Sequence, residues 1–581
     1  MTYRSPLADI EFCAAEIVGQ DRLAETTRFA EATAETRAAI LDEAAKLCEG
    51  VLAPINRDGD LYPAKLENGV VRCAPGFKEA YAEIAEGGWI GITGDPEYGG
   101  MGLPQCFAVC VNEMMASACL AISLNPLMSQ GQIEALEHHA SDAIKDLFLP
   151  KLNAGLWNGT MNLTESQAGS DVGALSTKAE PNGDGTYAVS GQKIFISWGD
   201  HDVCENICHL VLARLPDGVP GTKGISLFIV PKFLPDDDGN PGVANSLRAV
   251  SLEHKLGLHG SPTAVMEFDR ATGWMVGPEH GGMAAMFTMM NNARLGVGVE
   301  GLAIAEAATQ KAMAYALERK QGRTADGSPT IIGHADVRRM LMTMKTMTQA
   351  VRAICYDCAF SLDMGRAAES ADDRETHARR GAFLTPIAKA FGTDVGHEVA
   401  QLGIQVHGGM GFIEETTAAQ FARDVRVTAI YEGTNGIHAL DLVGRKLSVD
   451  GGAMARIMVG EIAATGADLA VAGAEFDDVA KAVLAAAEDA QETTKWMLAA
   501  PGMNDRAAGS SPYLRLMALA LGAHYLGRGA LAARDTDMAG TRLALARFFA
   551  TQIAPQTAGL AATAMLGAAQ LYALDADTLT A

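Results

Sequence analysis

The spacing of hydrophobic residues changes twice along this chain, and that change restricts the fold more than any other feature. From Glu31 to about Asn153 apolar residues recur at helical spacing, as in the run from Ala38 to Leu47. Between about Gly159 and Trp274 they form short runs bounded by Asn-Gly, Asp-Gly and Pro-Gly pairs, which predicts β-strands joined by turns. Helical spacing returns from Gly281 to about Leu447 and favours a helix bundle.

The last part of the chain, Asp450 to Ala581, is helical in pattern and very rich in alanine, which indicates an appended helical domain. A chain of 581 residues is also too long for one compact core. We therefore predict an α+β protein with four domains: an N-terminal helical domain (1–158), a middle antiparallel β domain (159–278), a helix bundle (279–447) and an additional C-terminal helical domain (448–581).

The charge and the first residues exclude several classes of protein. The formal net charge is −24, so DNA or RNA is repelled and is not an expected partner. Asp9, Glu11 and Glu16 interrupt the first twenty residues, which lack the basic start and apolar run of a secretory signal. No uncharged apolar stretch of about 18 residues stands out, so we expect a soluble, cytoplasmic protein that does not bind membranes.

The ten cysteines follow no regular framework, and we interpret them as reduced thiols that pack as small hydrophobic residues. Cys355 and Cys358 form a single C-x-x-C, and Cys204 and Cys208 lie close to His209. A four-ligand metal site would need a second pair at similar spacing. The sequence therefore predicts no metal.

The first segment of chemical interest runs from Met161 to Asp171 and is followed by a second part from Gly191 to Ser197. Small residues such as Gly169 and Ser170 allow backbone N–H groups and a hydroxyl to approach a phosphate or a heteroaromatic edge. Phe195 could cover the face of an aromatic ring. Taken alone, the two parts are equally consistent with an ordinary loop and strand.

A second segment, Ala429 to Gly436, places Glu432 between Tyr431 and Gly433. Burial in such surroundings raises the pKa of a carboxyl and makes the carboxylate a stronger base. Taken alone, a Glu-Gly pair is more often a helix cap or a turn. A third, glycine-rich segment from Gln405 to Phe412 lacks the G-x-G-x-x-G spacing and the preceding strand of a dinucleotide site, so nicotinamide binding is not supported.

Together and in this order, the segments resemble the acyl-CoA dehydrogenase family over residues 35–447. Six blocks carry the resemblance: T-E-x-x-A-G-S-D at Thr164–Asp171, G-x-K-x-[WF]-I-[ST] at Gly191–Ser197, K-L-G…S-x-T at Lys255–Thr263, A-L-E-R-K at Ala316–Lys320, Q-x-x-G-G-x-G-[FY] at Gln405–Phe412 and Y-E-G-T at Tyr431–Thr434.

The resemblance implies an FAD held between the β domain and the bundle, with a neighbouring subunit helping to hold the adenine end. Homo-oligomers follow, and the extra domain favours a homodimer. The residues implied to bind FAD are Met161, Leu163, Thr164, Gly169, Ser170, Phe195, Ser197, Arg319, Gln405, Gly409, Thr434 and Gly436. Those implied to meet the acyl-CoA are Ser170, Asn291, Arg294, Tyr431 and Gly433.

The implied reaction removes a proton from Cα of an acyl-CoA with Glu432 as the base and transfers a hydride from Cβ to the flavin. Some family members carry the base immediately before the CoA-contacting arginine, where this chain has Ala293. Two departures from the family pattern are Ser166 in place of a proline and the run Arg319 to Arg323, which lacks the phenylalanine that the family usually has soon after the Arg-Lys pair. The second departure puts the adenine contact near Arg319 in doubt.

The long N-terminal lead and the extra domain are similar to those of the large-subunit branch of the family. The resemblance implies 3-methylmercaptopropionyl-CoA as the substrate and methylthioacryloyl-CoA as the product, in dimethylsulfoniopropionate catabolism. A dehydrogenase of short- or medium-chain fatty acyl-CoA remains an alternative, since a sulfur and a methylene are similar in an apolar pocket, and an acyl-CoA oxidase is a further one. Electron-transferring flavoprotein is the implied electron acceptor.

Overall fold

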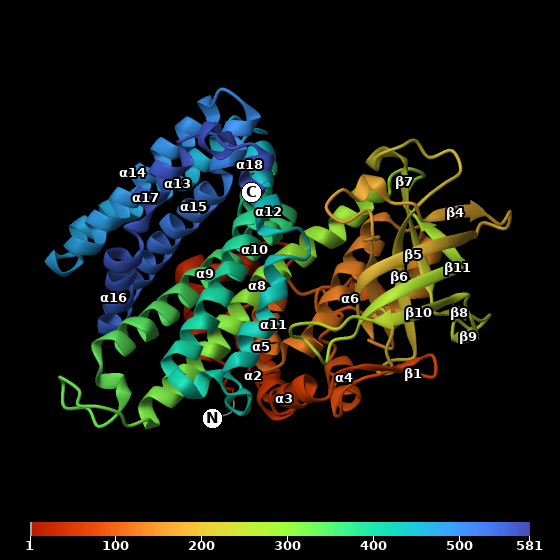
Figure 1. The fold of residues 1–581 in the computed structure, drawn as a ribbon, viewed down its shortest axis with the longest axis horizontal. Coiled ribbons are helices and arrows are strands. Elements are labelled where there is room, and N and C mark those ends of the chain that lie inside the picture. The colour runs from red at the N-terminus through yellow and green to blue at the C-terminus, as the bar shows by residue number, and fades with distance from the viewer. Residues whose placement is uncertain (1–2) are drawn as a thin grey trace.

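The β-strands lie at one end of the molecule, the last helices lie at the other, and the long helices α8, α9 and α10 lie between them (Figure 1). This computed structural model describes residues 3–581. The helices before the sheet are α1 (Leu7–Phe12), α2 (Ala34–Leu47), α3 (Ala53–Leu61), α4 (Phe77–Glu86), α5 (Gln105–Ala118), α6 (Leu120–His139) and α7 (Asp142–Asn153). Among them, α3 and α4 lie at the bottom of this view, and α6 lies between the long helices and the sheet.

Local sequence accounts for how these helices begin and which faces they bury. The side chain of Thr33 caps α2 by accepting a hydrogen bond from the N–H of Thr36. Leu41 and Ala44 then face the core at helical spacing. A short hairpin of β1 (Lys65–Glu67) and β2 (Val70–Arg72) interrupts this helical part, because Asn68-Gly69 supplies two consecutive positive φ angles, 52° and 77°, for a tight turn.

The β domain contains a ring of strands. β11 pairs with β5, β5 with β4, β4 with β6, β6 with β7 and β7 with β11, while β3 and β10 extend the sheet outside this ring. The seven strands are β3 (Trp157–Asn162), β4 (Lys178–Pro181), β5 (Tyr187–Ser197), β6 (Asn206–Arg214), β7 (Ile225–Pro231), β10 (Leu247–Leu252) and β11 (Thr263–Val276). A separate hairpin joins β8 (Phe233–Pro235) to β9 (Pro241–Ala244).

Two strand pairs depart from the antiparallel sheet predicted from the sequence, and one of them joins β4 to β6 in parallel through Lys178 and Arg214. β3 runs parallel to β6, from Trp157 opposite Asn206 to Asn162 opposite Val211. Parallel neighbours require a long connection, and β4 and β5 lie within the segment that provides it. β6 is buried on both faces, with Leu210 in the core shared with the helices and Val211 in the interior of the β domain. The sheet therefore packs directly on the helical core.

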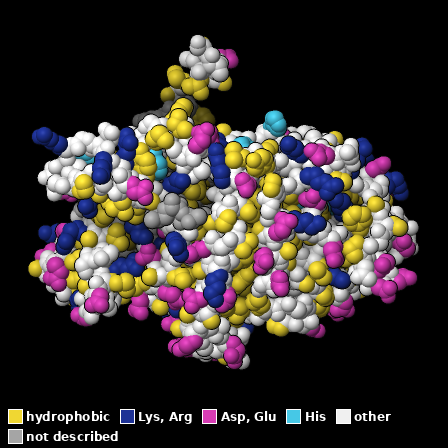
Figure 2. Space-filling model, turned by 90° about the horizontal axis from the view of Figure 1, so that it is seen from below, with side chains coloured by type: hydrophobic (Ala, Val, Ile, Leu, Met, Phe, Trp, Pro, Cys, Tyr) yellow, Lys and Arg dark blue, Asp and Glu magenta, His cyan; other side chains and the backbone are white. Residues whose placement is uncertain are grey.

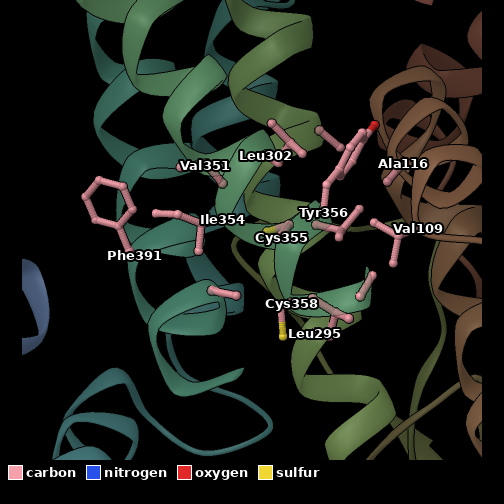
Figure 3. Packing of buried hydrophobic residues seen from close by; sticks show 14 of the residues in the cluster. Val109, Ala116, Leu295, Leu302, Val351, Ile354, Cys355, Tyr356, Cys358 and Phe391 are labelled. Carbon is pink, nitrogen blue, oxygen red and sulfur yellow. The ribbon is translucent and has the colours of Figure 1, made fainter. Parts of the chain in front are cut away.

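The helix bundle is built on three long helices, α8 (Gly282–Glu318), α9 (Ala335–Ala367) and α10 (Ala371–His407). Leu295 and Leu302 of α8, Ile354 of α9 and Phe391 of α10 are buried around their contact, where α5 also packs (Figure 3). Close backbone approach explains the glycines of α8, because a Cβ on Gly301 would lie 2.2 Å from the carbonyl oxygen of Gly392. Two short helices complete the bundle: α11 (Ala418–Val425) and α12 (Asn435–Asp441).

The last six helices form a layer beside α9 and α10 (Figure 1). They are α13 (Ala453–Ala472), α14 (Asp477–Ala499), α15 (Met503–Ala532), α16 (Ala539–Phe548), α17 (Gln556–Ala564) and α18 (Ala576–Thr580). Buried charges join this layer to the bundle. Arg380 of α10 donates to Asp357 of α9 at 2.7 Å and to Glu461 of α13 at 2.8 Å, and the hydroxyl of Tyr525 in α15 also donates to Asp357.

The N-terminal lead connects the same two parts. Asp9 of α1 accepts a hydrogen bond from Lys345 of α9 at 2.6 Å and another from Arg542 of α16 at 2.9 Å. On the surface seen in Figure 2, acidic and basic side chains are interspersed among apolar ones. None of the helices within residues 3–581 combines the length and the apolar character needed to cross a membrane.

Candidate active site

Glu432 lies in a short loop between a 3-10 turn, Arg426–Ala429, and the start of α12. Its φ is +54° and that of Gly433 is +87°. The left-handed region costs a residue with a Cβ about 1–2 kcal/mol, so the surrounding contacts must hold Glu432 in this conformation. Thr434 then caps α12 by accepting a hydrogen bond from the N–H of Ile437 at 3.3 Å.

Three side chains from neighbouring helices hold this loop. The Nζ of Lys389 in α10 donates to the carbonyl oxygen of Gly433 at 2.7 Å and to Oδ1 of Asn435 at 2.9 Å. The Nε2 of His438 lies 3.0 Å from the carbonyl oxygen of Glu432. Burial lowers the pKa of His438 to about 3, so its ring is neutral and this nitrogen carries the donated proton.

The third side chain is Glu300 of α8, which accepts a hydrogen bond from the hydroxyl of Tyr431. Together the three helices fix the backbone on both sides of Glu432. Glu432 as a residue is half-buried, and these contacts give it a rigid support.

The electrostatic surroundings of Glu432 suit a base that works near neutral pH. Burial raises the pKa of its carboxyl to about 7, although the positive charges of Arg294 and Lys389 oppose the shift. A carboxylate with a pKa close to the operating pH is both ionised to a useful extent and strongly basic. The environment therefore fits the role that the sequence predicted for Glu432.

In the β domain the structure brings together the segments predicted to contact the flavin ring. The N–H of Ile194 in β5 donates to the carbonyl oxygen of Thr164 at 2.9 Å, and Nζ of Lys193 donates to that of Leu163 at 3.0 Å. Phe195, one residue further on, has a φ of +60° and a side chain that is 60% exposed. An exposed phenylalanine held in a strained conformation is expected where a ligand ring covers it.

Glu165, for which we predicted no role, organises this loop. Its carboxylate forms an ion pair with the buried Lys193 at 2.8 Å and accepts hydrogen bonds from the backbone N–H groups of Ser176 and Thr177 at 2.7 and 3.0 Å. The negative charge is therefore fully compensated inside the β domain. Ser166, at the place of the family proline, is exposed, and in the described residues its side chain forms a hydrogen bond only to Gln167.

Gly436 lies in α12 close to Glu432, whereas the other three predicted flavin contacts lie far from it in the same chain. Arg319 follows the last residue of α8, and Gln405 and Gly409 lie at the end of α10. Tyr315 of α8 stacks on His407 of α10 with ring centroids 4.3 Å apart, so these two helix ends are neighbours. Arg294 lies about 38 Å away from Arg319 along α8, at a rise of about 1.5 Å per residue.

The residues predicted to contact acyl-CoA also fall into two groups, one around Glu432 and the other on the β-domain loop. Arg294 is buried close enough to Glu432 for their charges to interact, and its Nη1 donates to Oδ1 of the exposed Asn291 at 3.2 Å. Tyr431 and Gly433 flank the base. Ser170 is exposed on the β-domain loop, and among residues 3–581 it has no hydrogen bond to this group. Ala293, the alternative position for a base, is buried and apolar.

The residues present fit FAD. Exposed apolar side chains lie on the two segments that would face a ring system: Phe195 on β5, and Ile430 and Ile437 on either side of Glu432. A Cβ added at Gly169 or Gly409 would meet no atom within 4 Å, so the backbone there is open to a ligand group. Arg294 has a buried Nε without a hydrogen-bond partner among the described residues. The donors and the apolar surface thus suit a cofactor with both an aromatic ring system and charged groups.

Sequence reasoning missed Lys389 and Glu300. Each is a single charged residue within an apolar helical run, Ile387 to Phe391 and Val297 to Leu302 respectively. A lone charge on the buried side of such a run was the available signal. The ten cysteines are free. Within residues 3–581, one group of side chains has metal-binding spacing: Asp217, Glu279 and His280 near the surface. It includes no cysteine.

Comparison with known proteins agrees with this geometry. Models of the acyl-CoA dehydrogenase N-terminal, middle and C-terminal domains match residues 34–156, 160–271 and 280–447, and a model described as acetyl-CoA dehydrogenase C-terminal like matches 458–575. The chain is 44% identical to 3-methylmercaptopropionyl-CoA dehydrogenase of Ruegeria pomeroyi over 95% of this chain and 96% of that one. It is 38% identical to a butyryl-CoA dehydrogenase of Syntrophomonas wolfei over 71% and 70% of the two chains.

Among solved structures, an acyl-CoA dehydrogenase complexed with FAD from Bacillus anthracis shares the fold, with a TM-score of 0.74 at 18% identity over 100% of this chain and 94% of that one. The matched family models, the relatives and the shared fold define an FAD-dependent oxidoreductase. The chain belongs to the acyl-CoA dehydrogenase family.

Proposed function

We propose that this enzyme oxidises the Cα–Cβ bond of 3-methylmercaptopropionyl-CoA and forms methylthioacryloyl-CoA, a step of dimethylsulfoniopropionate catabolism. The observation that carries the proposal is the 44% identity to the Ruegeria pomeroyi enzyme, which extends over nearly the whole of both chains and so includes the extra helical domain. The butyryl-CoA dehydrogenase relative, matched over less of each chain, supports short-chain fatty acyl-CoA as the second candidate substrate.

Glu432 is the base in this proposal. Its carboxylate takes the proton from Cα, while Arg294 and Lys389 keep enough of it ionised near neutral pH. Within residues 3–581, no acceptor takes a hydrogen bond from the N–H of Glu432, which leaves this donor to polarise the thioester carbonyl and make the Cα proton acidic. When bound, FAD supplies the acceptor for the hydride from Cβ.

Phe195 and Ser197 flank the flavin ring in this proposal, and Met161, Leu163 and Thr164 contact its edge. Glu165 and Lys193 hold these contacts in place because they fix the loop to β5. Gly169 leaves room for a ligand group beside Ser170, which contacts both the cofactor and the CoA, and Asn291, Arg294, Tyr431 and Gly433 complete the substrate side.

We also propose a cytoplasmic homodimer of four-domain subunits, divided at 158, 278 and 447, with electron-transferring flavoprotein as the acceptor. The dimer is supported by the distance between the two groups of predicted flavin contacts: Arg319, Gln405 and Gly409 lie at the helix ends far from Glu432. Glu432, Phe195, Thr434 and Gly436 would serve the flavin of one subunit, whereas Arg319, Gln405 and Gly409 would reach the adenine end of the flavin held by the other.

The substrate is tested by anaerobic reduction of the bound flavin with 3-methylmercaptopropionyl-CoA, butyryl-CoA and octanoyl-CoA. The fastest bleaching of the flavin band is expected with the thioether substrate. Faster bleaching by butyryl-CoA would identify short-chain fatty acyl-CoA as the substrate. Rapid reoxidation of the reduced enzyme by oxygen would identify an oxidase. A colourless protein that does not take up FAD would contradict the whole proposal.

The shared site is tested with mixed dimers. Arg319→Ala and Glu432→Gln are each expected to impair turnover in homodimers, for different reasons. Co-expression of the two variants with different affinity tags produces heterodimers in which one of the two sites is intact. Recovery of activity in the doubly purified fraction supports the shared site, and no recovery contradicts it.

A further inference from the structure

Glu300 is a buried carboxyl that the proposed reaction does not use. It lies on α8 six residues after Arg294 and is 3% exposed. Its Oε2 accepts the hydrogen bond from the hydroxyl of Tyr431, and its Oε1 has no partner within residues 3–581. Tyr431 directly precedes Glu432, so this bond ties the residue before the base to α8.

Other buried carboxylates of the same helical core have a structural explanation, whereas Glu300 does not. Glu306, also on α8, pairs with Arg352 at 2.9 Å, and Glu113 of α5 pairs with the same guanidinium at 2.6 Å. Glu300 has no ion pair among the described residues. A buried carboxyl without a cation is costly, so its presence indicates a specific requirement at this position.

The groups around Glu300 come from two elements. Tyr431 and Glu432 face it from the loop, and Lys389 faces it from α10. Burial raises the pKa of Glu300 to about 8, and the charge of Glu432 adds to this effect, while the hydrogen bond from Tyr431 and the charge of Lys389 oppose it. The carboxyl is therefore largely neutral at pH 7, and a glutamine is its close isostere.

We propose that Glu300 is a positioning residue for the dehydrogenation, which holds Tyr431 and thereby fixes the direction in which the carboxylate of Glu432 meets Cα of the substrate. The inference rests on the proposed role of Glu432 as the base. The backbone of Glu432 is held in the left-handed region, and a loop in that conformation relaxes when an anchor is lost. Lys389 and His438 hold the carbonyl side of the loop, and Glu300 holds the side before the base.

The test compares Glu300→Leu, which removes the acceptor, with Glu300→Gln, which keeps it, and with Tyr431→Phe, which removes the donor. Anaerobic stopped-flow reduction of the flavin over a range of acyl-CoA concentrations separates the rate constant of reduction from the substrate Kd. Glu300→Leu and Tyr431→Phe are each expected to lower the rate constant by about 10- to 100-fold with little change in Kd, since a misplacement of about 1 Å can cost about 100-fold. Glu300→Gln is expected to stay within about threefold of the parent enzyme.

The double variant Glu300→Leu/Tyr431→Phe should be no slower than either single variant, because both remove one bond. Glu306→Gln is the matched control on α8, and it should keep the parent rate constant per bound flavin even where it lowers stability. Parent-like rates in both Glu300→Leu and Tyr431→Phe would overturn the proposal, as would equal slowing by Glu300→Gln or additive losses in the double variant.

Hydrogen exchange of the backbone amides 430–436 separates this inference from the proposed function. Glu300→Leu should raise the exchange rate of these amides well above that of Glu300→Gln in the FAD-loaded protein. If no acyl-CoA reduces the parent enzyme, the proposed function fails, while the exchange experiment still decides whether Glu300 holds the loop. Unchanged exchange in Glu300→Leu would show that it does not.

Discussion

The Nζ of Lys389 lies 2.7 Å from the carbonyl oxygen of Gly433, so a buried cation on α10 holds the backbone one residue beyond Glu432. The same ammonium group opposes the rise in the pKa of the Glu432 carboxyl. One side chain therefore combines two effects, since it fixes the position of the proposed base and adjusts its proton affinity.

Replacement of Glu432 by glutamine should remove the base and leave the site otherwise intact. We expect Glu432→Gln to retain FAD and to bind acyl-CoA, and to reduce its flavin at least about 100- to 10,000-fold more slowly, which is the usual contribution of a positioned base. Stopped-flow reduction without oxygen measures this directly. Glu415→Gln, at an exposed position in the 3-10 turn Glu414–Thr416, is the control and should behave as the parent. Near-normal reduction in Glu432→Gln would exclude Glu432 as the base.

The pH dependence of flavin reduction should reflect the raised pKa of Glu432. The base acts only when ionised, so at low substrate concentration the rate should rise about tenfold per pH unit below about pH 7 and level off above it. Lys389→Met removes a positive charge that lowers this pKa, and the rising limb should therefore move to higher pH. Lys389→Arg keeps the charge and serves as the control. A limb that stays in place in Lys389→Met would show that the ammonium group does not act on Glu432.

Phe195 should matter for cofactor binding and little for folding, because 60% of its side chain is exposed without a ligand. We expect Phe195→Ala to weaken FAD binding by about 2- to 12-fold, since aromatic pairs contribute about 0.5–1.5 kcal/mol beyond area burial. Titration of apoprotein with FAD, followed by flavin fluorescence, gives the Kd. Val243→Ala, at another exposed apolar position on β9, should leave this Kd unchanged. Equal Kd values for the two variants would place the flavin ring elsewhere.

Attachment of the C-terminal helical layer should depend on Arg380. Arg380→Met leaves the carboxylate of Asp357 buried without its main partner, which is expected to cost about 3–5 kcal/mol of unfolding free energy. The adjacent Arg379 forms only an exposed pair with Glu375, so Arg379→Met should cost less than about 0.5 kcal/mol. Guanidinium unfolding of both variants, followed by circular dichroism, measures the difference. Similar midpoints would mean that the buried pair contributes little to holding the layer.

Much of the fold could be predicted because the hydrophobic spacing differs between its parts. The helical, β and helical order, the extra helical domain and the position of Glu432 in a turn all follow from local pattern. The parallel pairing of β3 with β6 could not, because β6 is buried on both faces and lacks the alternation that reveals strand direction and partner. The β1–β2 hairpin was missed although Asn68-Gly69 is a turn signal, since its strands contain only three residues each.

The candidate site was predictable where its residues belong to compact blocks and not where they are single. Glu432 and Phe195 belong to such blocks. Lys389 and Glu300 are solitary charges on long helices, and nothing in the sequence alone states that they face the same loop. Glu165 lies inside a recognised block, but the six hydrogen bonds that its carboxylate accepts from four residues depend on Lys193 of β5 and on the segment before β4, which approach it only in the folded chain.

The contact between Asp9 and Arg542 joins positions 533 residues apart. A ribosome adds about 5–20 residues per second, so about half a minute to two minutes separates the synthesis of the two partners. During that interval the apolar side of α1 has part of its final packing surface missing. The contact between Asp9 and Arg542 therefore forms among the last events of biogenesis. A stalled or truncated nascent chain would expose its N-terminal segment to chaperones and proteases.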